Sequence, residues 1–333
     1  MNAKKKLLIT SLALILLWLI VVILSLSHGT FELNIFKNIS SYTDVDKKIF
    51  LSIRLPRVLM ASIAGGVLAI SGAALQALFR NPLASPFTLG ISGGASLGAL
   101  IAIKLSLVQS LFGFAYISVF AFFFSVLTIF FVFRVSKIQG VVATGRLLLA
   151  GVVANFLYSA VILFIQFFSQ FTESLHTLKW IMGSLDIVGL SVVWKTAVIA
   201  LPASAVLILI SKDMNIFSLG NDVASSLGVN VRRMEKLIYF TTSIAAGVVI
   251  SVTGPIGFVG LIIPHILRLV IGVDNRIILP CSFLLGASFL TATDTIARII
   301  ISPIEIPVGI ITASVGGIFF LWLLIKTKKE VII

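Results

Sequence analysis

The architecture of this chain rests on the stretch RLPRVLMASIAGGVLAISGAALQALFRNPLASPFTLGISGGASLGALIA, residues 54–102. An apolar run dense in Gly, Ala and Ser is interrupted at Arg80-Asn81-Pro82, and it resumes at Gly90. Small residues let helix backbones approach closely in a bilayer, where apolar side chains gain little by leaving lipid. Non-helical backbone at membrane depth is tolerated only where it is buried in protein or lines a water-filled cavity. We therefore expect this stretch to face other helices and a water-filled path through the protein.

The composition of the chain is that of a membrane protein. Of its 333 residues, 59% are hydrophobic and 11% are charged, whereas soluble domains carry about 25% charged residues. The net charge of +13 does not indicate nucleic-acid binding, because the basic residues lie at the ends of apolar runs, as membrane topology requires. The single cysteine, Cys281, excludes a disulfide framework and a cysteine metal cluster.

The lengths of the apolar runs predict an all-α polytopic membrane protein with about ten transmembrane helices, because each span needs roughly 20 apolar residues. The first run follows a lysine-rich start and is read as an uncleaved helix. A polar segment covers about 28–50, and a short surface helix is expected within 173–190. The expected spans are about 7–27, 55–79, 90–108, 113–133, 145–168, 192–211, 237–253, 253–272, 277–297 and 307–325.

Ten spans place both termini on one side of the membrane, and the distribution of lysine and arginine favours the cytoplasmic side for both. A weak internal echo supports inverted-repeat halves: AGGVLAISG, residues 64–72, resembles AAGVVISVTG, residues 245–254. The first segment begins outside and the second inside, which is the arrangement of many transporters. We expect residues 1–333 to form one transmembrane domain.

Three segments carry a family resemblance. RLPR, SGAALQALFRNPLASP and LGISGGASLGA together resemble the signature of the permease subunits of type II ABC importers for iron-siderophores, haem and cobalamin. Later segments extend the resemblance over essentially the whole chain. It implies a permease dimer, either a homodimer or a related heterodimer, with two copies of a separate ATPase subunit and a substrate-binding protein.

Arg54, Arg57 and Arg298 lie at the predicted outer ends of spans, against the general charge bias. One interpretation is that they reach lipid headgroups, as arginines at helix ends often do. The other rests on the resemblance, which implies that arginines at these positions receive glutamates of the substrate-binding protein. Arginine is well suited to bidentate pairing with a carboxylate.

The polar segment at about 212–230 contains MNIFSLGNDVASSLG, which is either an ordinary loop or a surface for a partner. Its apolar residues favour a packed segment, and Asn221 or Asp222 could cap a short helix that ends at Gly228. The resemblance implies that it forms the paired short helices that fit a groove of the ATPase subunit. The residues that match this pattern are Leu219, Gly220, Val223, Leu227 and Gly228.

The resemblance also implies a cytoplasmic gate at Asn81, Pro82, Leu83 and Thr144, where the alternative is plain turn chemistry. Gly145 stands where a hydroxyl residue is expected, so the gate chemistry departs from the family pattern.

Two further ionisable residues have structural interpretations. Asp294 is the acid deepest in an apolar run, which makes it a functional candidate, but its i,i+4 spacing from Arg298 favours an internal ion pair. His265 is expected to be structural, because the other two histidines lie in predicted outer loops and no metal ligands accompany it. We expect neither a metal site nor a cofactor.

The resemblance predicts the permease of an ATP-driven importer in a bacterial cytoplasmic membrane. The sequence contains nothing like G-x-x-x-x-G-K-[ST], so ATP hydrolysis is assigned to a separate chain and the permease is not an enzyme. A secondary transporter should carry several mid-membrane acids or histidines, and a membrane enzyme needs a catalytic constellation; neither pattern is found. Among cargoes, a ferric siderophore is expected first, then haem, then cobalamin.

Overall fold

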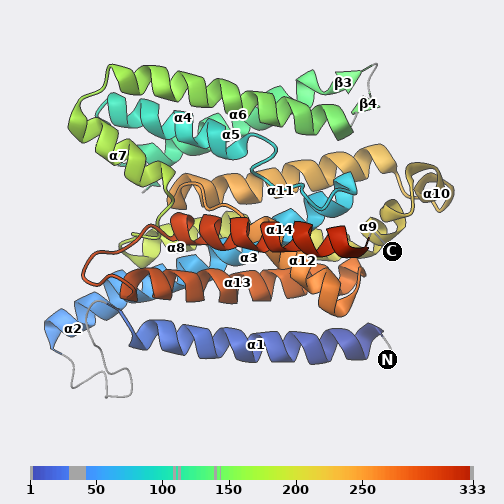
Figure 1. Ribbon diagram of the computed structural model, residues 1–333, viewed down its shortest axis with the longest axis horizontal. Coiled ribbons are helices and arrows are strands. Elements are labelled where there is room, and N and C mark those ends of the chain that lie inside the picture. The colour runs from blue at the N-terminus through green and yellow to red at the C-terminus, as the bar shows by residue number, and fades with distance from the viewer. Residues whose placement is uncertain are drawn as a thin grey trace.

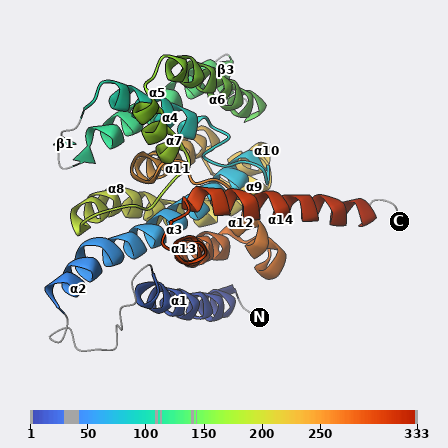
Figure 2. The same ribbon diagram turned by 60° about the vertical axis from the view of Figure 1, so that its left-hand side comes forward.

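The computed structural model describes residues 3–29, 43–107, 110–111, 114–138, 141–142 and 144–330. Most of the polar segment expected at 28–50 therefore lies outside the described residues. The long helices lie roughly side by side, with both marked chain ends at one end of the bundle (Figure 1). We call this end, which also carries α9 and α10, the inner end, and the opposite end, which carries α2 and α7, the outer end (Figures 1 and 2).

Helices make up nearly all of the described secondary structure, apart from two short two-stranded pairs, β1–β2 and β3–β4. The elements are α1 (Ala3–Ser27), α2 (Asp44–Lys48), the π-helix η2 (Ile49–Arg54), α3 (Leu55–Phe79), α4 (Ile91–Lys104), β1 (Ser110–Leu111), β2 (Phe114–Ala115), α5 (Tyr116–Val135), β3 (Lys137–Ile138), β4 (Val141–Val142), α6 (Thr144–Phe167), α7 (Phe171–Ile181), α8 (Leu190–Leu209), α9 (Ser211–Ser218), α10 (Asn221–Ser226), α11 (Val231–Thr253), α12 (Val259–Ile271), α13 (Asn275–Ile299) and α14 (Val308–Glu330).

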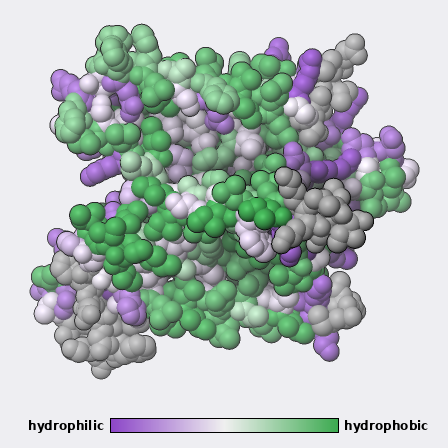
Figure 3. Space-filling model, viewed as in Figure 1, coloured by the Kyte–Doolittle hydropathy of each residue, from purple (hydrophilic) through white to green (hydrophobic). Residues whose placement is uncertain are grey.

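The expectation of about ten membrane helices is confirmed. Among the described residues, eight helical segments are long and apolar enough to cross a membrane, and the shorter apolar helices α4 and α12 complete the set. On the face shown in Figure 3, hydrophobic side chains cover the middle of the bundle and hydrophilic ones gather toward its two ends. The short surface helix expected within 173–190 is α7.

The central helix is α3, because almost every residue of it is buried. A proline at its first turn suits a helix start, and Arg80 ends it in a left-handed conformation with φ of 46°. Its small residues allow close contact with α12: a Cβ added to Gly72 would collide with the carbonyl of Gly260. The helix expected at 55–79 therefore has the predicted bounds, and its Gly-Ala pattern reflects packing against other helices.

The inverted arrangement is visible in the directions of α3 and α11. Helix α3 runs from the outer end to the inner end, where Arg80 contacts α10. Helix α11 starts beside α10 and ends at the outer end, where the carbonyl of Thr253 accepts a hydrogen bond from the backbone N–H of Ser184 (2.9 Å). Each is followed by a non-helical segment with proline and then by a short apolar helix, α4 or α12.

We expect Gly72→Ala to destabilise the protein by about 1–3 kcal/mol, because the added methyl group must displace a backbone carbonyl in a packed interface. Thermal unfolding of the purified protein in detergent measures the effect. Gly317→Ala in α14 is the matched control, because a Cβ added there would enter open space beside its helix. Equal unfolding temperatures for the two variants would contradict the close contact between α3 and α12.

Candidate functional site

The α9–α10 pair at the inner end presents apolar side chains on its surface. Met214, Phe217 and Ala224 are buried beneath it, whereas Leu219, Val223 and Leu227 are 68%, 44% and 59% exposed. Exposed apolar side chains gathered in one place are typical of a protein contact surface. The residues expected to contact an ATPase thus lie on one protruding element.

Two glycines shape this element. Gly220 has a φ of 124° and Gly228 a φ of 84°, which are conformations that residues with a side chain rarely adopt. Gly220 joins α9 to α10, and Gly228 follows α10. The expectation that Asn221 or Asp222 caps the second helix is wrong, because Gly220 occupies the cap position. The side chain of Asn221 instead accepts a hydrogen bond from Arg80 (2.7 Å).

Arg80 joins α3 to the α9–α10 pair, a role that sequence reasoning missed. One guanidinium nitrogen donates to the carbonyl of Phe217 (2.9 Å) and to the side-chain oxygen of Asn221 (2.7 Å). The guanidinium also lies 5.3 Å from the centre of the Phe217 ring. The available signal was an arginine directly before the predicted Asn81-Pro82 break.

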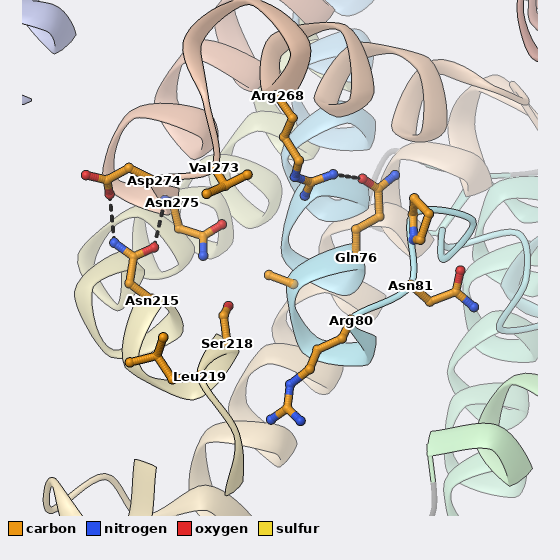
Figure 4. A pocket seen from close by; sticks show the side chains of 12 residues that line it. Gln76, Arg80, Asn81, Asn215, Ser218, Leu219, Arg268, Val273, Asp274 and Asn275 are labelled. Carbon is orange, nitrogen blue, oxygen red and sulfur yellow. Dashed lines mark hydrogen bonds between the residues drawn. The ribbon is translucent and has the colours of Figure 1, made fainter. Parts of the chain in front are cut away.

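Asn215 of α9 makes a second connection, to the start of α13. Its amide nitrogen donates to the Asp274 carboxylate (2.7 Å), and its oxygen accepts from the backbone N–H of Asn275 (2.8 Å). Figure 4 shows these reciprocal hydrogen bonds. Asp274 also accepts hydrogen bonds from the Arg276 guanidinium, which together with Asn215 lowers the pKa of Asp274 to about 2.

A pocket of about 530 Å³ lies between α3, α9, α12 and the start of α13. Two of the expected gate residues, Asn81 and Pro82, line it, and Arg268 reaches across to the Gln76 side chain (Figure 4). Leu83 is exposed, and its backbone N–H donates to the Asn81 side chain (2.9 Å), a turn-forming contact. Thr144 is the first residue of α6, and its side chain lies outside the described residues. The gate itself stays a prediction.

At the outer end, Arg57, Arg298, Asp294, Asp186 and Glu305 form an outer ion cluster. The Asp294 carboxylate lies 3.0 Å from Arg57 and 3.1 Å from Arg298. Arg57 also pairs with Asp186 at 3.1 Å and with Glu305 at 2.5 Å. The predicted pairing of Asp294 with Arg298 is therefore confirmed, and Arg57 completes a network that sequence spacing did not indicate.

The three outer arginines come together as the topology predicts, but their side chains point into the protein. Arg54, Arg57 and Arg298 are 4%, 7% and 4% exposed. Arg54 donates to the carbonyl of Leu26 (2.7 Å), and Arg298 donates to the hydroxyl of Ser25 (2.8 Å). This burial excludes the interpretation that the three guanidinium groups contact lipid headgroups. The exposed members of the outer ion cluster are Asp186 and, in part, Glu305, whose side chains are 70% and 30% exposed.

A lateral groove of about 760 Å³ lies between α4, α6, α7, α14 and the segment before α12. Its lining is apolar or carries neutral hydroxyl and amide groups. The lining residues are Phe87, Ser92, Gly93, Ser96, Asn155, Ser159, Ile162, Leu163, Gln166, Leu178, Ile181, Met182, Pro255, Gly257, Phe258, Gly309, Ile310 and Ala313. Asn155, Ser159 and Gln166 share one face of α6, and the buried amide nitrogen of Gln166 has no hydrogen-bond partner among the described residues.

His265 stacks edge-on against Phe319 and near Phe320, with ring centres 5.8 and 6.3 Å apart. Within the described part of the chain, no group of three or more His, Cys, Asp and Glu side chains is arranged to hold a metal ion. The ring contacts of His265 with Phe319 and Phe320 agree with the structural role expected for it.

Comparisons with known proteins agree on one family. A model of the FecCD transport family matches residues 16–326. The chain is 37% identical to the hemin transport system permease protein HmuU of Yersinia pestis, over 95% of both chains. It is 41% identical to the cobalamin import system permease protein BtuC of Halobacterium salinarum, over 82% of this chain and 72% of that one. A solved metal-chelate type ABC transporter in an inward-facing conformation superposes with a TM-score of 0.84 and 32% identity, over 95% of this chain and 98% of the other.

Proposed function

Because the chain belongs to the FecCD transport family, we propose that this permease of an ABC importer carries a ferric siderophore across a bacterial cytoplasmic membrane. The permease is the transport component, and a separate subunit hydrolyses ATP. The observation that carries the proposal is the lateral groove, in which none of the described lining residues carries a charged side chain. The lateral groove is our candidate for the cargo path.

The neutral lining favours a chelate over a bare metal ion. A protein that binds a bare ferric or divalent ion supplies carboxylate, imidazole or thiolate ligands from its own side chains. A siderophore brings its own ligands, so the permease needs only a fitting apolar surface and a few hydrogen bonds. The polar face of α6 offers such hydrogen bonds to an oxygen-rich chelate through Asn155, Ser159 and the Gln166 amide nitrogen, which has no partner among the described residues.

Haem and cobalamin are the alternative cargoes, because two similar permeases are named for them. Haem iron is usually held by His, Cys, Met or Tyr, and among the described lining residues of the lateral groove Met182 alone is of such a type. Hydroxyl and amide groups outnumber it there, which favours the siderophore. The mechanism is the same for all three cargoes.

A second permease copy would complete the path. Helices α6 and α14 border the lateral groove, and beside it they present large apolar side chains: Phe156 is 74% exposed, Leu163 66% and Ile318 69%. A second copy placed against α6 and α14 would cover these side chains and enclose the groove. Whether that copy is identical or a related chain is decided by co-purification from the native membrane.

The partners are assigned to the two ends of the bundle. The ATPase subunit binds the α9–α10 pair through the exposed Leu219, Val223 and Leu227, and we call α9 and α10 the coupling helices from here on. The substrate-binding protein docks at the outer end. Because Arg57 is buried and already paired, carboxylates of that protein would have to replace Asp186 and Glu305, the more accessible partners of Arg57.

Reconstitution in liposomes tests the proposed function. The permease is combined with the ATPase and the substrate-binding protein encoded beside it, and uptake of a labelled ferric siderophore, haem or cobalamin is compared. We expect siderophore uptake that requires ATP and all three components, and Gln166→Leu should lower it several-fold by removing a polar contact. Uptake of haem or cobalamin alone would refute the siderophore assignment. Uptake driven by an ion gradient without the ATPase would refute the importer mechanism.

A further inference from the structure

Helices α3 and α13 are fastened to each other from the outer end to the middle of the bundle. At the outer end, Arg57 of α3 forms a forked ion pair with Asp294 of α13, with contacts of 3.0 and 3.1 Å. About one turn further in, the hydroxyl oxygens of Ser62 and Thr291 are 3.1 Å apart. Figures 1 and 2 both show the two helices as neighbours in the middle of the bundle.

The contact between the two backbones is close in the middle of the bundle. A Cβ added to Gly65 of α3 would collide with the carbonyl of Gly286 of α13, and one added to Gly286 would collide with the carbonyl of Gly65. Sliding one helix along the other would drive larger neighbouring side chains into this contact. It would also separate buried charges at the outer end, which is costly in a low-dielectric interior. The pair therefore resists relative movement.

The inner ends of the same two helices are the points at which the coupling helices are attached. Arg80, which ends α3, holds the carbonyl of Phe217 and the side chain of Asn221. Asn215 holds Asp274 and the backbone of Asn275 at the start of α13. Arg80 and Asn215 line the same pocket, and Figure 4 shows their side chains on different sides of it. Hydrogen bonds are directional, so each attachment fixes orientation as well as distance.

We propose that Arg80 and Asn215 are positioning residues that fasten the coupling helices to α3 and α13, and that α3 and α13 move as one body linking the coupling helices to the outer ion cluster. This proposal rests on the proposed function, because it names the helices through which a movement driven by the ATPase is transmitted. A displacement of α9 and α10 would be transmitted to the outer end by α3 and α13 moving together. Docking of the substrate-binding protein at the outer end would move the same two helices and so affect the ATPase.

A reversible cross-link tests whether α3 and α13 move as one body. Ser62→Cys and Thr291→Cys are introduced together with Cys281→Ser, so that the new pair are the only cysteines of this chain. The 3.1 Å spacing of the native hydroxyl oxygens suits a disulfide without large backbone movement. We expect the oxidised complex to retain at least half of the uptake rate of the reduced one. Loss of uptake on oxidation that a reductant reverses would overturn the proposal.

Arg80→Gln and Asn215→Ala test the attachments in the full complex of permease, ATPase and substrate-binding protein. The readout is uptake per ATP hydrolysed, because a merely structural defect lowers both quantities through the amount of active complex. We expect the ratio of uptake to ATP hydrolysed to fall about tenfold in Arg80→Gln and in Asn215→Ala. Arg80→Lys should recover part of it, because lysine keeps the charge but not the planar guanidinium that lies over the Phe217 ring.

Tyr239→Phe is the matched control, because it removes one buried hydrogen bond, to the carbonyl of Ile129 (3.0 Å), that belongs to neither attachment. Its ratio should equal that of the unmodified protein. An unchanged ratio in Arg80→Gln and Asn215→Ala would overturn the role of the attachments. Failure of the proposed function would instead show as absent ATP-dependent uptake in the unmodified complex. If Arg80→Gln or Asn215→Ala does not assemble, the other of the two variants decides the role of the attachments, and the cross-link decides separately whether α3 and α13 move as one body.

Discussion

Asp294→Leu is expected to lower the free energy of unfolding by about 3–5 kcal/mol, because it leaves buried charges without the carboxylate they share. The Asp294 side chain is 1% exposed and lies between Arg57 and Arg298 at 3.0 and 3.1 Å. Arg57 would keep Glu305 and Asp186, whereas Arg298 would be left with neutral acceptors such as the Ser25 hydroxyl. Thermal unfolding in detergent and the yield of folded protein measure the loss.

Two variants distinguish the loss of the buried Asp294 charge from a general effect of mutation at the outer end. Asp186→Asn alters an ion pair whose acidic side chain is 70% exposed, so we expect a change of about 0–1 kcal/mol. Asp294→Leu combined with Arg298→Met removes the uncompensated cation as well as the anion, and it should recover part of the stability. A single Asp294→Leu variant as stable as the unmodified protein would show that the outer ion cluster does not stabilise the fold.

The helices could be predicted closely because their causes are local. Apolar length sets each span, and the breaks at Arg80-Asn81-Pro82 and at Gly254-Pro255 set where α3 and α11 end. The Leu-Gly pattern likewise has a local origin, since Gly220 and Gly228 adopt backbone conformations that favour glycine. These features could be read from a few neighbouring residues at a time.

The pairing of side chains could not be predicted in the same way. The i,i+4 spacing indicated the Asp294–Arg298 pair, but Arg57 lies 237 positions from Asp294, and only the packing of α3 on α13 brings them together. The same packing buries Arg57, and contacts with α1 help to bury Arg54 and Arg298, although a topology argument places all three near the surface. The link from Arg80 to Asn221 spans 141 positions, and it also explains why Asn221 does not cap its helix. Long-range contacts of this kind leave no periodic signal in one sequence.

The second large effect is expected at the coupling helices, where Leu219→Glu combined with Leu227→Glu should weaken binding of the ATPase at least about 100-fold. Burying one leucine side chain contributes about 1.5–3 kcal/mol, and tenfold in affinity corresponds to about 1.4 kcal/mol. Two leucines therefore account for a 100-fold change even at the lower estimate. Binding of the purified ATPase to the permease in lipid nanodiscs measures it.

Exposure makes this test cleaner than one in the core. Leu219 and Leu227 are 68% and 59% exposed in the isolated chain, so glutamate at these positions should leave the fold intact and act on the partner contact alone. Val188→Glu is the matched control, because Val188 is 72% exposed and lies next to Gly189, whose N–H donates to Ser52 at the outer end. Unchanged ATPase affinity in the double variant would place the ATPase contact elsewhere on the inner end. A loss of ATPase affinity in the double variant but not in Val188→Glu would support the coupling helices as the ATPase contact. Movement driven by ATP hydrolysis would then pass from this contact to α3 and α13.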